Sequence, residues 1–349
     1  MAAGPLVSFL MPVYNAAVTV ERAVDSILRQ RDAPGLEAVV VDDGSTDRTP
    51  EILARLAQRD SRVVPVTIPH QGLVAALITG QSRCRGAFLA RLDADDIAHP
   101  ERVKEQLALA GSDPGLGLVG SQVRYFPRRF LREGLLYYEN WLNSLLDCRD
   151  SPGVVHNRIM RELFIECPLA HPTFFLRREA FDQAGGYRDF QGLPEDYDLC
   201  FRIAESGWRL GGVGRVLHYW REHAARSSHT DQRYSEESFR RLKLHYLVKL
   251  KLDNGTRPVS ICGAGPVGKA WLKDILASGL EVRYLIEVNP RKIGKKIHGV
   301  PVVRAEDLTG LKDPGLILGA VGQKGARPGV RALLDLLGYV EGVNYIFVA

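Results

Sequence analysis

The sequence predicts an α/β protein with a mainly parallel sheet flanked by helices, followed by a second, smaller α/β domain. Three observations favour this class. Short apolar runs alternate with helical patterns over the first hundred residues, a Gly-x-Gly-x-x-Gly pattern opens a similar series at Gly263, and 349 residues are enough for two domains. A turn-rich break at 253–258 separates the two series. We expect a first domain at 1–230, a helical linker at 231–256 and a second domain at 257–349.

Four apolar runs of strand length alternate with three helical patterns in the first domain. Pro12 is expected to stop the first strand, and Thr49 is expected to cap the second helix with Pro50 at its first position. This order predicts parallel strands with helices on both faces of the sheet. The strands are expected at residues 7–11, 38–41, 63–66 and 87–92, and the helices at 20–28, from 49 onward and at 73–80.

Polar clusters follow three of these strands, at 14–15, 42–45 and 93–96. Ligands of open parallel sheets collect at the carboxyl ends of the strands, so the three clusters should meet in one crevice. Any one of them is also compatible with ordinary turn chemistry, because Asp, Asn, Gly and Ser are the usual turn residues. Three together favour a binding site.

The most informative cluster is the tetrad Asp93-Ala94-Asp95-Asp96. Three carboxylates within four positions raise each other's pKa unless a cation intervenes. Asp93 and Asp95 would share a face if the strand continued through them. Carboxylates suit Mg²⁺ or Mn²⁺, which bind through one or two of them together with substrate phosphates. A solvated acidic turn is the simpler alternative.

Composition limits the class of protein only broadly. The net charge of +5 is compatible with anionic substrates or RNA and decides for neither. The five cysteines lack metal-finger spacing, which is typical of thiols in a reducing compartment. No apolar run approaches the roughly 20 residues that span a bilayer. We therefore expect a cytoplasmic protein without a membrane span.

Five motifs follow one another over about the first 230 residues: Ser8–Asn15, Val40–Asp47, Leu92–Asp96, His171–Arg178 and Pro194–Leu199. Together they resemble family 2 glycosyltransferases. This resemblance implies a GT-A fold that binds a nucleotide-diphospho-sugar, and an inverting enzyme. A Gln-x-x-Arg-Trp motif and a transmembrane helix, which accompany processive membrane synthases, are not found, so we expect non-processive transfer.

The resemblance implies a donor site, most simply for a UDP-sugar. Pro12 and Tyr14 match positions that contact the nucleobase, with the tyrosine ring stacked on it, and Asn15 ends the same motif. Asp43 matches the acid that hydrogen-bonds the base, and Asp42 lies beside it near the nucleoside. The first acid of the Asp-x-Asp motif, Asp93, should approach the ribose and the metal.

The remaining roles concern the metal and the catalytic base. Asp95 matches the direct ligand of Mn²⁺ or Mg²⁺, and His223 lies where many relatives carry a histidine near the metal or diphosphate. Asp96 is interpreted as capping the following turn. Asp196, beside Glu195, matches the catalytic base, although acids also commonly begin helices.

The acceptor is the least determined part of the site. An aromatic helical stripe at 137–146 is a candidate contact, although such stripes are more often core. A looser resemblance to the β-1,3-N-acetylglucosaminyltransferase-like group, associated with queuosine in tRNA, implies a tRNA acceptor rather than a glycan. A non-catalytic sugar-nucleotide-binding regulator is the rival from another class.

The second domain opens with Gly263, Gly265 and Gly268 after a strand, and Glu287 ends the next strand where a ribose ligand is expected. This pattern indicates a small Rossmann-like unit and is compatible with bound NAD or another nucleotide. Fewer than a hundred residues remain, half of a two-nucleotide domain, so a half-fold used for packing or homodimerisation is the simpler interpretation. Its strands are expected at 259–262, 282–286, 300–303, 315–318 and 344–348.

Overall fold

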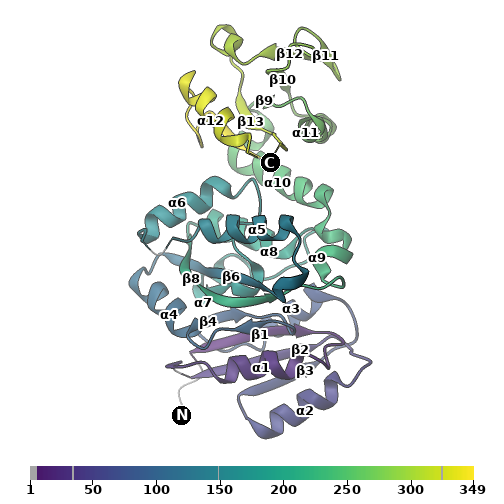
Figure 1. The fold of residues 1–349 in the computed structure, drawn as a ribbon, viewed down its shortest axis with the longest axis vertical. Coiled ribbons are helices and arrows are strands. Elements are labelled where there is room, and N and C mark those ends of the chain that lie inside the picture. The colour runs from purple at the N-terminus through teal and green to yellow at the C-terminus, as the bar shows by residue number, and fades with distance from the viewer. Residues whose placement is uncertain (1–5, 34, 148, 324) are drawn as a thin grey trace. The chain divides into compact units, whose positions relative to one another are not determined.

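The computed structural model describes residues 6–33, 35–147, 149–323 and 325–349, which form two compact units (Figure 1). The first unit consists of Met1–Ile159 and Pro168–Asp231, as far as these are described. The second consists of Met160–Cys167 and Gln232–Ala349. In this division the short segment 160–167 and residues 232–256 of the expected linker belong to the second unit.

An eight-stranded mixed sheet forms the centre of the first unit, in the order β3-β2-β1-β4-β7-β6-β8-β5. Strands β1 to β4 are parallel, and β7 is antiparallel to both β4 and β6. The predicted α/β class with a mixed, helix-flanked sheet is thereby confirmed. The strands are β1 (Val7–Val13), β2 (Leu36–Asp42), β3 (Val63–Thr67), β4 (Phe88–Arg91), β5 (Ile97–Ala98), β6 (Leu116–Phe126), β7 (Phe175–Arg177) and β8 (Arg209–Arg221).

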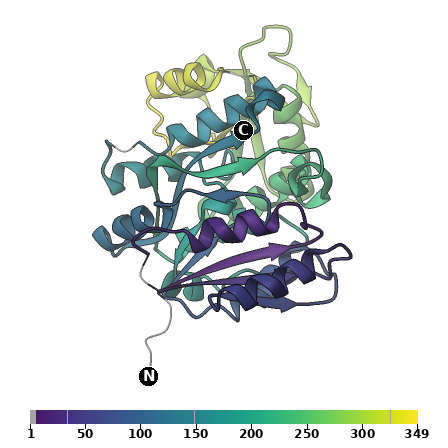
Figure 2. The same ribbon diagram turned by 60° about the horizontal axis from the view of Figure 1, so that its bottom comes forward.

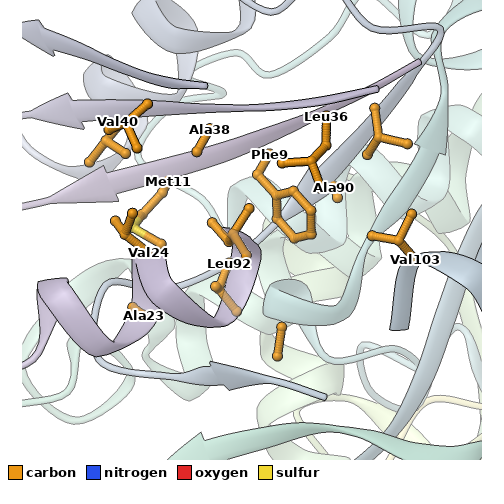
Figure 3. Close-up of a cluster of buried hydrophobic side chains, with 14 of the residues drawn as sticks. Phe9, Met11, Ala23, Val24, Leu36, Ala38, Val40, Ala90, Leu92 and Val103 are labelled. Atoms are coloured by element: carbon orange, nitrogen blue, oxygen red, sulfur yellow. The ribbon is translucent and has the colours of Figure 1, made fainter. Parts of the chain in front are cut away.

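Helices cover both faces of this sheet, as the continuous apolar strands predict. Helix α1 lies along one face (Figure 2), where its Val24 belongs to one buried apolar cluster with Met11 and Val40 (Figure 3). On the other face α3 approaches so closely that a Cβ at Gly80 would lie 2.3 Å from Leu10 Cδ1. The helices are α1 (Val20–Leu28), α2 (Thr49–Arg59), α3 (Leu73–Gln81), α4 (Arg102–Ser112), α5 (Glu133–Ser144), α6 (Pro152–Glu162), α7 (Arg178–Gln183), α8 (Glu195–Glu205) and α9 (Ser227–Thr230).

The prediction that Pro12 stops the first strand is wrong, because β1 runs to Val13. The even-numbered residues of β1 direct their backbone groups toward β4, as the bond from Leu92 N–H to Leu10 O shows. The pairing of β1 with β4 ends at Leu10, so position 12 has no paired residue on β4. The missing N–H of Pro12 therefore removes no hydrogen bond from the sheet.

Two further boundaries differ from the sequence prediction. Thr49 is the first residue of α2 rather than its cap, and its N–H donates to Asp47 Oδ1 at 2.9 Å. Strand β4 ends at Arg91, and the tetrad forms a turn in which Asp96 N–H donates to Asp93 O at 3.2 Å. Asp93 and Asp95 therefore do not share one face of a continuing strand, and that prediction is wrong.

The second unit contains a six-stranded sheet in the order β11-β12-β10-β9-β13-β14, parallel except for β11. All five expected strands are present, and they give the order of a small doubly wound sheet. Helices α10 (Glu236–Lys251), α11 (Pro266–Ala277) and α12 (Arg327–Leu336) accompany it. The strands are β9 (Val259–Cys262), β10 (Val282–Glu287), β11 (Lys296–Ile297), β12 (Val300–Arg304), β13 (Leu316–Gly319) and β14 (Tyr345–Phe347).

The sequence prediction also concerned membrane-spanning segments and the cysteines. Within the described ranges, no helix is sufficiently long and apolar to cross a membrane. Cys84, Cys167, Cys200 and Cys262 are buried, whereas Cys148 lies outside the described residues. Burial raises the pKa of the Cys84 and Cys262 thiols to about 12, so neither is a thiolate at neutral pH.

Candidate active site

The Asp95 carboxylate lies in the turn after β4 and is joined to the segment that follows β8. Its Oδ2 is 2.8 Å from Nε2 of His223. Burial raises the pKa of Asp95 to about 6, the charges of Asp96 and Asp93 add to this, and the contact with His223 opposes it. Self-repulsion of this kind favours binding of a cation at the turn.

Asp96 is completely buried, and the interpretation of this residue as a turn cap is wrong. Its carboxylate accepts hydrogen bonds from the N–H of Arg221 at 2.7 Å and contacts Nε2 of His218 at 2.8 Å. Burial, together with the charge of Asp93, raises the pKa of Asp96 well above its usual value. The physical reason is the β5–β8 pairing, which places His218 opposite Ala98 and encloses the carboxyl group. Asp96 thereby fixes the end of β8, and with it His223, to the tetrad.

Asp93 is paired with an arginine that the sequence prediction missed. Arg91 Nη2 donates to Asp93 Oδ1 at 2.6 Å, and the Arg91 side chain is 2% exposed. Burial alone lowers the pKa of Arg91, but Asp93, Tyr187 and Glu195 more than offset this and raise it. A lone charge inside the apolar run 87–92 was the signal in the sequence.

The nucleobase candidates lie at the end of β1. Tyr14 is 45% exposed and stacks on the ring of His70, with centroids 4.1 Å apart and an interplanar angle of 19°. Asn15 organises the next loop, because its Oδ1 accepts the N–H of Thr46 at 2.8 Å. Pro12 is buried within β1. His70, which follows β3 at a strand end, is a site residue that the sequence prediction missed.

The acidic pair after β2 is largely engaged by the chain itself. Asp43 is buried and accepts the N–H groups of Gln71 and Gly72 at 2.8 Å each, with His70 Nδ1 also 2.8 Å away. Asp42 Oδ1 accepts one backbone N–H, while its buried Oδ2 has no hydrogen-bond partner among the described residues. Asp43 therefore holds the loop before α3, and Asp42 offers an open acceptor at the same strand end.

Glu195 and Asp196 begin α8, as expected of acids in a first helical turn. Asp196 is partly exposed, and its Oδ1 accepts the N–H of Tyr197 at 2.7 Å. Glu195 is buried, with Oε1 3.5 Å from Nδ1 of His171. Burial and the nearby Arg91 charge lower the pKa of His171 well below its usual value, so the imidazole is neutral.

The predicted metal ligands are only partly assembled. Asp95 and His223 are in contact, but Asp93 is paired with Arg91. In the part of the chain that the structure describes, no group of three or more His, Cys, Asp or Glu side chains is placed to hold a metal. The structure thus offers two protein ligands rather than the predicted three.

The Gly-rich loop of the second unit has a packing explanation. Gly263 has φ of +112°, and a Cβ added there would lie 2.8 Å from Ala320 O. A Cβ at Gly268 would lie 1.7 Å from Gly263 O, so only glycine lets α11 approach β9 this closely. At Gly265 a Cβ would meet nothing within 4 Å.

The candidate ribose ligand Glu287 is engaged by this loop. Its Oε2 accepts the Ala264 N–H at 3.2 Å and pairs with Lys292 Nζ at 2.9 Å. Lys292 Nζ also donates to Ala264 O at 3.1 Å. The Lys292 ammonium therefore contacts both Glu287 and the Gly-rich loop, the two groups that were expected to contact a nucleotide.

The mixed sheet, its flanking helices and the acids at the strand ends are typical of GT-A glycosyltransferases, which act on nucleotide-sugars. Residues 8–185, just over half of the chain, match the family model for glycosyl transferase family 2. The chain therefore belongs to family 2 of the glycosyltransferases. It is an enzyme by that membership, which leaves no basis for the rival interpretation as a non-catalytic regulator.

Similar proteins agree with this assignment. The chain is 29% identical over 226 residues to EpsE of Bacillus subtilis (strain 168), covering 64% of this chain and 75% of EpsE. It is 37% identical over 203 residues to a chondroitin synthase of Pasteurella multocida (strain Pm70), covering 58% of this chain but 19% of that protein. The crystal structure of S. aureus TarS 1–349 with UDP-GlcNAc has a TM-score of 0.54 at 16% identity, covering 70% of this chain and 67% of TarS, which supports the fold.

Proposed function

We propose that this enzyme transfers a sugar from a UDP-sugar to an acceptor hydroxyl in a metal-dependent, inverting and non-processive reaction. The observation that carries the proposal is the contact between Asp95 and His223, 2.8 Å long, in a turn whose three carboxylates repel one another. The preference for UDP rests on the motif resemblance of the residues after β1 and β2.

The donor base is proposed to bind at the carboxyl ends of β1 and β2. Tyr14 stacks on His70 with one face, and its other face can stack on a nucleobase. The unpartnered Oδ2 of Asp42 can accept a hydrogen bond from the nucleoside. Asp43 supports this site by holding the Gln71–Gly72 backbone in place.

Asp95 and His223 fit a divalent cation such as Mn²⁺ or Mg²⁺, which needs only one or two protein ligands when substrate phosphates supply the rest. Burial and the charges of Asp96 and Asp93 raise the pKa of Asp95, and a cation held there would oppose both effects. When bound, such a cation neutralises charge that develops on the diphosphate leaving group.

Asp196 is proposed as the general base that takes the proton from the acceptor hydroxyl. It is partly exposed, whereas Glu195 is buried and cannot reach an acceptor without rearrangement. With a base on the side opposite the leaving group, the acceptor oxygen displaces the nucleoside diphosphate in a single step, which inverts the configuration of the anomeric centre. Glu195 supports the position of Asp196 from within α8.

The acceptor is proposed to be a glycan, with a modified tRNA nucleoside as the second candidate. One observation favours the second: residues 232–349 contain 19 Lys and Arg against 11 Asp and Glu, a net charge of +8 within a chain of +5. Such asymmetry is typical of chains that contact polyanions. Parallel assays with oligosaccharides and total RNA distinguish the two acceptors.

The test is a panel of UDP- and GDP-sugars in the presence of Mn²⁺. A donor that binds the native state raises the melting temperature according to its affinity. We expect a UDP-sugar to stabilise wild type and Asp196→Asn alike, while only wild type releases UDP and forms a product of inverted anomeric configuration. If no UDP-sugar binds or turns over, the proposal is overturned.

A further inference from the structure

We infer that Arg221 is a positioning residue, whose side chain holds Asp95 in the orientation in which the Asp95 carboxylate meets His223. The inference rests on the proposed function, in which Asp95 and His223 hold the metal. It adds to that function a residue for which the sequence motifs imply no role.

Arg221 is the last residue of β8, and several neighbours fix it in place. It pairs in register with Phe126 of β6, and Phe126 O accepts the N–H of Glu222 at 2.8 Å. The N–H of Arg221 donates to Asp96 Oδ1 at 2.7 Å. The guanidinium carbon lies 4.5 Å from the centroid of the Phe126 ring, within the range of a cation–π contact. Both the backbone and the side chain of Arg221 are therefore held by the protein itself.

Arg221 and His223 contact two different groups of the same residue. Nε of Arg221 donates to the backbone oxygen of Asp95 at 2.7 Å, and Nε2 of His223 lies 2.8 Å from the carboxylate oxygen Oδ2 of Asp95. Asp95 belongs to the turn between β4 and β5, so the strand ladders do not hold its carbonyl group. The bond from Arg221 is charge-assisted, which makes it stronger than a bond between neutral groups. Arg221 therefore ties the backbone of Asp95 to the same segment that carries His223.

The position of this contact determines the effect that we expect from Arg221. Its Nε bonds the backbone of Asp95, so the Asp95 carboxylate remains for His223 and a cation. Groups that orient the ligands of a metal affect its affinity, and their loss typically costs about 10- to 100-fold. Arg221 touches neither the cation nor the reacting atoms in this scheme. Its loss should therefore weaken metal binding more than it slows transfer at saturating metal.

Arg177 offers a matched control in the same sheet. Like Arg221, it is half-buried, ends a strand and pairs in register with a phenylalanine, Phe88, whose ring centroid lies 5.3 Å from its guanidinium carbon. Its Nε also donates to a backbone oxygen, that of Leu116, at 3.2 Å. Phe88 is the first residue of β4, whereas the tetrad follows the last. Arg177→Gln therefore removes the same kinds of contact at the other end of β4.

The test measures Mn²⁺ binding in the presence of UDP by electron paramagnetic resonance for wild type, Arg221→Gln, Arg221→Lys and Arg177→Gln. We expect Arg221→Gln to bind Mn²⁺ about 10-fold more weakly and to keep most of its rate at saturating Mn²⁺. Arg221→Lys should lie between, because its ammonium can donate to a carbonyl oxygen but is not a planar group that stacks on a ring. Arg177→Gln should lower the melting temperature and keep the Mn²⁺ affinity of wild type. Without metal, hydrogen exchange of the turn 93–96 should be faster than in wild type in Arg221→Gln and unchanged in Arg177→Gln.

The outcomes separate this inference from the proposed function. If wild type neither binds Mn²⁺ nor consumes a UDP-sugar, the proposed function fails, and hydrogen exchange alone decides whether Arg221 holds the turn. If wild type binds Mn²⁺, either equal Mn²⁺ binding or unchanged exchange of the turn in folded Arg221→Gln overturns the role of Arg221. A rate lowered equally at every Mn²⁺ concentration would also overturn it. If Arg221→Gln does not fold, Arg221→Lys decides, and wild-type Mn²⁺ affinity in that variant contradicts the inference.

Discussion

Nε2 of His223 lies 2.8 Å from Oδ2 of Asp95, although the two residues are 128 positions apart in the chain. Their contact depends on β8, which ends beside the tetrad because Asp96 accepts the N–H of Arg221. The Asp95 and His223 side chains, which suit a divalent cation, are thus brought together by the buried carboxyl group of Asp96, which holds the end of β8.

Replacing His223 by alanine should weaken metal binding and lower activity by about 10- to 100-fold, as expected when one side chain at a metal site is removed. The measurement is activity as a function of Mn²⁺ concentration. His229→Ala is the matched control, because His229 is equally exposed and also contacts a carboxylate, that of Glu222. Equal Mn²⁺ dependence of the two variants would contradict the assignment of His223.

Replacing Tyr14 by alanine should weaken donor affinity by about 10-fold, because base–aromatic stacking contributes about 1–3 kcal/mol. Tyr14→Phe should keep most of the affinity, since the ring remains. Tyr137→Ala is a suitable control, because Tyr137 has the same 45% exposure but lies on α5. Isothermal titration with a UDP-sugar measures the difference, and an unchanged affinity of Tyr14→Ala would place the base elsewhere.

The contribution of His171 to the free energy of unfolding should fall as the pH is lowered from about 6.5 toward 5. The pKa of His171 is depressed by burial and by Arg91, so the unfolded chain takes up a proton in this range and the folded chain does not. Each such group contributes up to about 1.4 kcal/mol per pH unit. His218 is buried and depressed in the same way.

Chemical unfolding at several pH values tests this sign. His171→Gln should show a shallower loss of unfolding free energy below pH 6.5 than wild type, with the remaining slope due to His218 and other groups. An identical slope in the variant would mean that His171 is protonated in the folded state.

Gly268→Ala should destabilise the second unit by about 1–3 kcal/mol or more, because the added Cβ would lie 1.7 Å from Gly263 O. Gly265→Ala should leave the stability nearly unchanged, since its Cβ meets nothing within 4 Å. Thermal unfolding checks both. If the loop binds a nucleotide, Gly265→Ala should instead abolish a nucleotide-induced rise in melting temperature that wild type shows.

Much of the fold was predictable from local patterns. The parallel strands β1 to β4 and the strands of the second unit are continuous apolar runs, and their ends carry the polar residues of the site. The burial of Asp96 was not predictable in this way, because its partners His218 and Arg221 lie more than 120 residues away on β8. That strand reaches the tetrad only through the antiparallel part of the sheet, which no local pattern indicated.

The roles of Arg91 and His171 were missed for a related reason. Arg91 lies two residues before Asp93, yet its burial within β4 depends on packing by distant parts of the chain, which a local pattern does not report. His171 lies in a motif that carried the family resemblance, but its neutrality follows from complete burial, which sequence does not report.

The most direct test of the central claim is the rate of Mn²⁺-dependent UDP-sugar consumption by wild type, Asp95→Asn and Asp32→Asn. Asp32 is an exposed acid paired with Lys104 and lies outside the site. We expect Asp95→Asn to lower the rate by about 1,000-fold or more, and Asp32→Asn to match wild type. A folded Asp95→Asn enzyme with the wild-type rate and Mn²⁺ dependence would contradict it.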